Sequence, residues 1–239
     1  MAAPDAFSIV VLAAVGAVFI AYNVTVVARA HGGGGAAALH AVILESGSAF
    51  IAKHLEKDDA ATSTLAVQSL RNTVLVAIFI GGIAFQAFQV SAAAAGAAGD
   101  AAAAARLLIL SAFLLASFLN FALVIRAASH LAYVLGGARH AAAAAAAGTD
   151  GSAAEEGRGA AAAAAARHSR TVASLCRSLM RGLSLHFSLG FRCLYASVPY
   201  SFAAAGPVAL VVAAGGMLAF LAYADFGMTA HGRHEEELE

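Results

Sequence analysis

Residues 65–90 read LAVQSLRNTVLVAIFIGGIAFQAFQV, and this stretch decides the class of the protein. A polar and basic group of side chains lies between Gln68 and Thr73, and the apolar run that follows carries no charge. An α-helix rises 1.5 Å per residue, so about 20 apolar residues cross a hydrocarbon core about 30 Å thick. The pattern predicts a membrane-spanning helix with Arg71 at the water boundary, because an arginine at mid-membrane would cost roughly 2.5–3.5 kcal/mol.

The composition indicates an integral membrane protein. Of 239 residues, 61% are hydrophobic and 12% are charged, and the mean hydropathy is +0.80. Soluble domains carry about 25% charged residues, so this chain has too little polar surface for a globule in water. The 14 basic and 14 acidic side chains balance, which argues against nucleic acid as a partner. Cys176 and Cys193 lack the spacing of a metal or redox motif.

Four apolar segments predict an all-α integral membrane bundle of four transmembrane helices. The predicted spans are 7–28, 65–90, 106–126 and 194–224, and the third continues as helix to residue 135. The first span is longer than the apolar core of a signal peptide and no basic side chain precedes it, so we expect it to be retained. Two prolines, Pro199 and Pro207, should bend the fourth span.

Small residues predict where these helices approach one another closely. In the second span Ala77 lies one turn before Gly81 and Gly82. The last span carries three more candidate packing residues: Gly206, Gly215 and Gly216.

The segments outside the spans predict two cytosolic amphipathic helices. Apolar residues recur at helical spacing within 39–57 and again within 167–187, which suits helices lying on the membrane surface. The second of these is alternatively the extended base of the last span. The alanine-rich stretch 138–166 is expected to be a disordered insertion, and 225–239 to be a polar, acidic tail.

Basic residues predict the orientation in the membrane. Four spans place both termini on one side, and the positive-inside rule assigns the cytosolic side. Only Arg106 and Arg233 fall on the side of the termini, so both termini are expected to face away from the cytosol. The other twelve basic residues lie on the opposite side: Arg29, Lys53, Lys57, Arg71, Arg126, Arg139, Arg158, Arg167, Arg170, Arg177, Arg181 and Arg192.

Each predicted span carries an arginine at its cytosolic end, and together they form a candidate anion site. A guanidinium group binds a phosphate or carboxylate through two parallel hydrogen bonds, so converging arginines could hold an anionic lipid headgroup. The alternative is that these arginines only anchor the spans by reaching to the lipid phosphates. The candidate binding residues are Arg71, Arg126, Arg192, Gln68, Asn72, His130 and Tyr195, with Arg29 and Asn120 near them.

The stretch LAVQSLRNT at 65–73 resembles an uncharacterised membrane-protein family, domain of unknown function 599 (DUF599), found in plants and bacteria. The similarity extends to LVIRAASHLAYVLGG around Arg126, to GFRCLYASVP around Arg192, and to AGPV and YADF in the last apolar segment. The resemblance implies a multi-span membrane protein in which Gln68, Arg71, Asn72, Arg126 and Arg192 are motif positions. The family brings no established activity with it.

We therefore expect a non-enzymatic membrane protein that binds an anionic lipid or a partner at its cytosolic arginines. The sequence has no HExxH, P-loop or GxSxG motif, and we assign no catalytic residue, metal or cofactor. Two alternatives stay open. One is a transporter or channel for small solutes or ions that works as a homo-oligomer, and the other is a membrane enzyme that modifies lipid headgroups.

Overall fold

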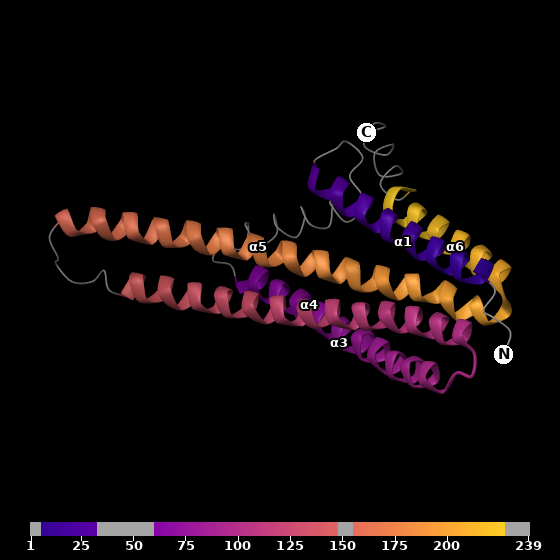
Figure 1. Cartoon of the computed structure of the whole chain (residues 1–239). Coiled ribbons are helices and arrows are strands. Elements are labelled where there is room, and N and C mark those ends of the chain that lie inside the picture. Colours follow the sequence, from indigo (N-terminus) through magenta and orange to yellow (C-terminus); the bar gives the residue numbers. More distant parts are fainter. Residues whose placement is uncertain (1–5, 33–59, 148–154, 228–239) are drawn as a thin grey trace.

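The computed structural model describes residues 6–32, 60–147 and 155–227, and all of its regular elements are helices (Figure 1). They are α1 (Ala6–Gly32), α3 (Ala60–Ala97), α4 (Ala101–Ala147), α5 (Glu155–Ser201), η2 (Phe202–Ala205), α6 (Pro207–Ala222) and the π-helical turn η3 (Tyr223–Gly227). The all-α prediction is confirmed. The predicted surface helix within 39–57 lies outside the described residues.

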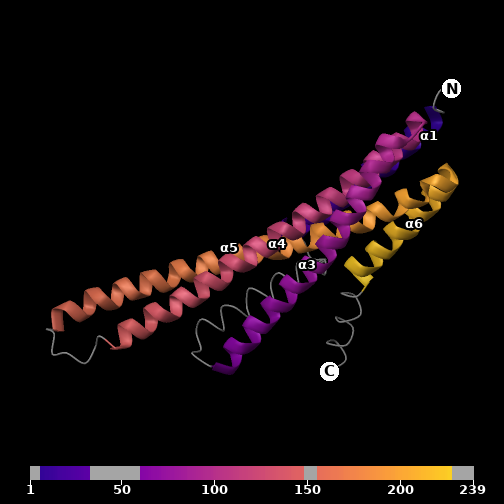
Figure 2. The same cartoon turned by 90° about the horizontal axis from the view of Figure 1, so that it is seen from below.

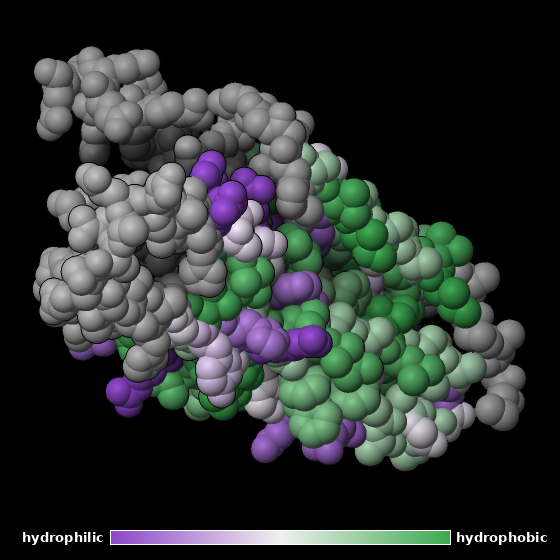
Figure 3. All heavy atoms as spheres, turned by 90° about the vertical axis from the view of Figure 1, so that its left-hand side faces the viewer, coloured by the Kyte–Doolittle hydropathy of each residue, from purple (hydrophilic) through white to green (hydrophobic). Residues whose placement is uncertain are grey.

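Four of these helices are long and apolar enough to cross a membrane. Their apolar windows are Ile9–Val26, Val67–Ala97, Ala101–Gly137 and Pro207–Phe226. Large apolar side chains on these windows are exposed, including Val208 at 75% and Phe79 at 68%, as expected of surfaces covered by lipid. Figure 3 shows hydrophobic residues (green) covering one side of the view and hydrophilic residues (purple) gathered toward the other.

The helices α3, α4 and α5 form the larger part of the bundle, and Phe121 on α4 is buried at its centre. A Cβ added at Gly81 of α3 would lie 3.1 Å from the Phe121 Cβ, and one added at Gly190 of α5 would lie 3.0 Å from its ring. The two glycines therefore let the backbones of α3 and α5 approach Phe121 from two sides. Figure 2, together with Figure 1, shows α3 crossing α4 obliquely.

The other predicted packing residues are placed differently. Ala77 is fully buried in the cluster around Phe121. A Cβ added at Gly82, Gly215 or Gly216 would meet no described atom within 4 Å. These three glycines face away from the described helices.

The predicted fourth span, 194–224, is two helices that run in opposite directions. Helix α5 ends at Ser201, and α6 begins at Pro207 after the short η2 turn. Between them Gly206 has φ +111°, a conformation that a residue with a Cβ rarely adopts. Pro207 lacks a backbone N–H and is pre-shaped for the first position of a helix, so it starts a new helix instead of bending an old one.

This reversal places the described ends of the chain at opposite ends of the bundle. Helices α1 and α6 run parallel, because Leu12 packs with Leu210 near their starts and Tyr22 bonds to Asp225 near their ends. The expectation that both termini lie on one side rested on a single last span. The reversal at Gly206 adds one more pass of the chain along the bundle, which separates the two described ends. The side of the membrane that each terminus faces stays a prediction.

Helix α5 also differs from the expected surface helix. It is one continuous helix of 47 residues, so the amphipathic stretch 167–187 is the extended base of a bundle helix, the second of the two alternatives. The alanine tracts expected to be disordered continue α4 to Ala147 and begin α5 at Glu155. Alanine has the highest helix propensity of all residues, which accounts for this continuation. Residues 148–154 and 228–239 lie outside the described part of the chain.

Candidate functional site

A buried ion pair joins α6 and its following turn η3 to α5, which belongs to the larger part of the bundle. Arg192 on α5 is 5% exposed and Asp225 on η3 is 6% exposed. The Arg192 Nη2 donates to the Asp225 Oδ1. On α1, the Tyr22 hydroxyl donates to the other carboxylate oxygen at 2.5 Å. This polar cluster therefore connects α1, α5 and the end of the α6 segment.

The other two guanidinium nitrogens of Arg192 also donate hydrogen bonds. Its Nη1 donates to the Asn23 Oδ1 at 3.3 Å and its Nε to the Ser188 Oγ at 3.1 Å. The guanidinium carbon lies 5.8 Å from the centre of the Tyr22 ring, within the range of a cation–π contact. A charge buried in an apolar bundle is tolerated when it is paired and hydrogen-bonded in this way. Arg192 is thus neutralised inside the protein.

This placement differs from the expected anion site, in which arginines at the cytosolic ends of the spans converge. Arg192 was expected at the cytosolic rim, and Asp225 was expected in the polar tail. The structure gives Arg192 a carboxylate of this chain as its anion. No local pattern pairs the two residues, since they are brought together by the reversal at Gly206.

Arg71 and Arg126 remain exposed, and neither forms an ion pair within the described ranges. Leu70 packs against the core of the bundle, so Arg71, about 100° further round α3, lies on one flank of that helix. On α4, Phe118 faces α3 and Asn120 faces α5. Arg126 lies about 80° beyond Phe118, on the flank turned away from α5.

The helix geometry therefore puts Arg71 and Arg126 on the same outer face of the α3–α4 pair. Gly81 lies opposite Phe121, and Leu70 packs in one cluster with Leu131. This register sets Arg71 and Arg126 about one helical turn apart in depth, or roughly 6 Å.

The other flank of α3 lines an open groove toward α5. Its lining residues are Gln68, Ser69, Asn72, Thr73, Val76 and Phe187, and its volume is about 450 Å³. Ser69 precedes Leu70 and Arg71 follows it, so the two point to opposite sides of the core-facing line. Of the residues predicted to form one site, Gln68 and Asn72 line this groove, whereas Arg71 does not.

Asn120 and Tyr195 make contacts elsewhere in the bundle, whereas His130 lies one helical turn beyond Arg126 on α4. The Asn120 Oδ1 is hydrogen-bonded to the His186 Nδ1 at 3.0 Å between α4 and α5. The Tyr195 ring packs on the rings of Phe191 and Phe220. His130 is exposed on α4. Arg29 belongs to α1, and its side chain is not among those described.

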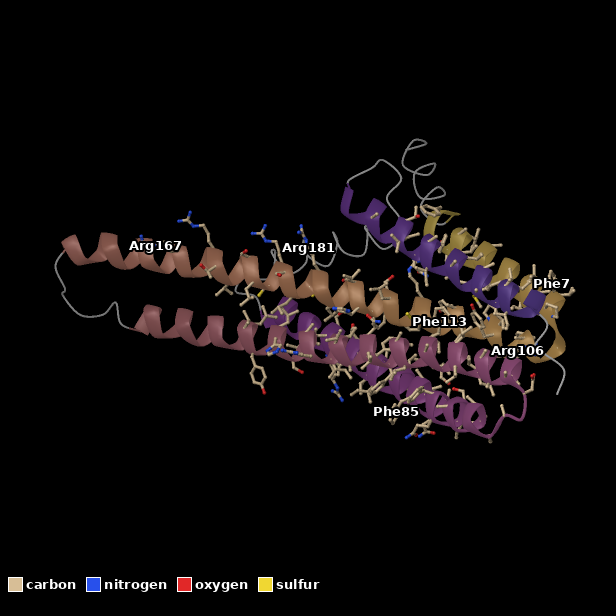
Figure 4. The ribbon with its side chains drawn as sticks, viewed as in Figure 1. Phe7, Phe85, Arg106, Phe113, Arg167 and Arg181 are labelled. Carbon is tan, nitrogen blue, oxygen red and sulfur yellow. The ribbon has the colours of Figure 1, made fainter. Side chains whose placement is uncertain are left out.

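Four arginines form a basic stripe along one face of residues 167–187, the part of α5 that we call the α5 extension. Figure 4 shows Arg167 and Arg181 directed to the same side of this helix. Arg170 and Arg177 share this face by helical spacing. The described residues contain no cluster of three or more His, Cys, Asp or Glu side chains that could hold a metal ion.

The four long apolar helices and the charges paired inside the bundle define a multi-pass membrane protein of the α-helical class. The chain belongs to the family described as "Protein of unknown function, DUF599", whose family model matches residues 40–230. The resemblance seen in LAVQSLRNT is thereby confirmed. No curated protein and no solved structure matches the chain.

Proposed function

We propose that this protein is a non-enzymatic membrane protein that binds anionic lipid headgroups through Arg71 and Arg126. Both lie toward the end of the bundle at which α1 ends and α3 begins, which we call the basic end. The observation that carries the proposal is that both arginines are exposed on one outer face of the α3–α4 pair. Both also lie within helix windows apolar enough to span a membrane. A cation on such a surface needs an anion, and a lipid phosphate is the anion that a bilayer supplies.

The distribution of charge supports this assignment and suggests an orientation. Among the described side chains, the basic end carries Arg71, Arg126, Arg167, Arg170, Arg177 and Arg181, whereas Arg106 lies at the opposite end and Arg192 is paired inside the bundle. The positive-inside rule then makes this end cytosolic. The C-terminal end of the last helix falls in the cytosol and the start of α1 on the opposite side. The cytosolic leaflet is rich in anionic lipids, which suits the proposed ligand.

Substitution by lysine tests the proposal. If Arg71 or Arg126 only anchors a helix, lysine serves as well, because it reaches the interface and keeps the charge. If the planar guanidinium grips a phosphate, lysine cannot reproduce the paired hydrogen bonds. We expect Arg71→Lys and Arg126→Lys to retain less phosphatidylserine than wild type in nanodiscs, measured by mass spectrometry.

The double variant should lose less than the sum of the single losses, because the two arginines share one ligand. Arg167→Lys, on the α5 extension, is the matched control and should retain phosphatidylserine as wild type does. If both single variants retain as much phosphatidylserine as wild type, the two arginines only anchor their helices and the proposal is wrong.

Transport is a second candidate, and the buried pair of Arg192 and Asp225 is the observation that favours it. Ionisable residues inside membrane bundles often mark the paths of ions or solutes. A solute flux into protein-containing liposomes that is lost when Asp225 is substituted would support this candidate. The absence of any flux through the wild-type protein would oppose it.

A further inference from the structure

The groove between α3 and α5 offers polar side chains that the bundle itself does not use. The carboxamides of Gln68 and Asn72 and the hydroxyl of Ser69 line it, and none of the three side chains bonds to another described residue. Thr73 differs, because its hydroxyl donates to the Ser69 carbonyl at 3.0 Å.

Other asparagines of the membrane domain show the contrast. Asn120 donates to the Ala116 carbonyl and pairs with His186, and Asn23 donates to the Phe19 carbonyl and accepts from Arg192. Both ends of these two carboxamides are occupied. The carboxamides in the groove thus keep two donors and an acceptor each for a ligand.

The opposite wall of the groove is aromatic. The Phe187 ring packs edge-on against the Phe121 ring, with 6.1 Å between the ring centroids. It also packs against the Phe191 ring, with 5.0 Å between the centroids. Val76 extends the apolar part of the lining, and no charged side chain belongs to it. A few polar groups on an apolar, aromatic surface are typical of small-ligand sites, and about 450 Å³ falls within their usual range.

We propose that this groove binds a hydroxyl-rich, uncharged ring, such as the sugar or inositol ring of a lipid headgroup. Each ring hydroxyl donates and accepts, which matches a carboxamide that does both, and the C–H face of the ring packs on Phe187. Gln68 is the second residue of the apolar window Val67–Ala97, so the groove lies at headgroup depth. Arg71, which binds phosphate in the proposed function, does not line the groove, although it lies one turn after Gln68 on α3.

The test uses full-length protein in phosphatidylcholine nanodiscs doped with one further lipid. The doping lipids are an inositol phospholipid, a neutral glycosyl diacylglycerol, and phosphatidylserine, which is anionic but has no hydroxylated ring. The variant is Gln68→Leu with Asn72→Leu, and the control is Gln86→Leu with Gln89→Leu, two exposed glutamines of the same helix. The readout is the enrichment of each lipid over phosphatidylcholine, measured by mass spectrometry.

We expect wild type and control to enrich at least one ring-bearing lipid, and the groove variant to lose this enrichment roughly tenfold, since several hydrogen bonds are lost together. Phosphatidylserine enrichment should stay unchanged in the groove variant, whereas Arg71→Lys should reduce it. Enrichment of the neutral glycolipid as well as the inositol lipid identifies the ring as the recognised group. Heat protection by free glucose or inositol that depends on Gln68 and Asn72, without lipid enrichment, assigns the same chemistry to a soluble source.

The proposal is overturned if neither ring-bearing lipid is enriched and free sugars give no protection. It is also overturned if the groove variant enriches the ring-bearing lipids as wild type does. A loss of phosphatidylserine in the arginine variants alongside either of these results would leave the proposed function standing while removing this one.

Discussion

Arg192 and Asp225 lie 33 positions apart in sequence and form an ion pair inside the bundle, across the reversal at Gly206. The pair requires α5 and α6 to fold back on each other, because otherwise each charge would be buried alone. Tyr22 and Asn23 add α1 to the same cluster. The ion pair therefore specifies how the α1–α6 pair docks on α5.

Removing one partner of this pair should destabilise the protein strongly. A buried ion pair broken from one side typically costs about 3–5 kcal/mol, because the remaining charge stays buried without a partner. We expect Arg192→Met and Asp225→Leu each to lower the melting temperature in detergent. The double variant should melt above at least one of the single variants, since it leaves no unpaired charge.

Tyr22→Phe is the matched control for the same cluster, because it removes one hydrogen bond and keeps both charges. Its cost should be roughly 1.5–3 kcal/mol, the range for a hydrogen bond to a charged group. Additive losses in the arginine–aspartate double variant would show that the two charges do not interact in the folded protein.

Two glycines should respond to alanine in opposite ways. A Cβ at Gly190 would lie 3.0–3.1 Å from three atoms of the Phe121 ring, so Gly190→Ala should cost about 1–3 kcal/mol through overpacking. A Cβ at Gly82 would meet no described atom within 4 Å, and alanine gains roughly 0.5–1 kcal/mol over glycine within a helix. Thermal unfolding in detergent should show a loss for the first variant and a small gain for the second. A stabilised Gly190→Ala would mean that α4 and α5 lie further apart than described.

The sequence predicted the class of the protein because the apolar windows are local features. Leu65 to Val90 and the segment that follows Arg106 each carry enough apolar residues to cross a bilayer without reference to any other part of the chain. Helix α5 was harder to place. Its last third carries Arg192, His186 and several serines, so its composition does not indicate a membrane helix, although it packs between the apolar ones.

The candidate site was harder still, because it depends on pairs of residues. A basic residue at the end of a predicted span looks the same whether it reaches outward to lipid, as proposed for Arg71, or inward to a carboxylate, as Arg192 does. Asp225 follows the last apolar run directly, and this position is the one local signal that could have suggested a partner for Arg192. The flank of α3 that each residue occupies depends on Leu70 facing the core. A single sequence does not reveal that Leu70 does so.

The alanine-rich connection between α4 and α5 should be dispensable for the stability of the bundle. Residues 141–165 supply mainly alanine, which buries little apolar area, and loop closure changes slowly with length. Deleting them should leave the expression level and the melting temperature in detergent near wild type. A fall of several degrees would show that the helical continuations of α4 and α5 support each other.

The orientation can be tested with single cysteines in a background that carries Cys176→Ala and Cys193→Ala. Gly99, exposed in the turn between α3 and α4, lies at the end of the bundle that carries Arg106 and should be labelled by a membrane-impermeant thiol reagent in intact cells as Gly99→Cys. Ser152→Cys and Thr229→Cys should both be shielded until the membrane is permeabilised if the basic end is cytosolic, as proposed, because α6 runs from Gly206 back toward that end. Labelling of Thr229→Cys together with Gly99→Cys would mean that the chain crosses the membrane an even number of times and would contradict the hairpin of α5 and α6.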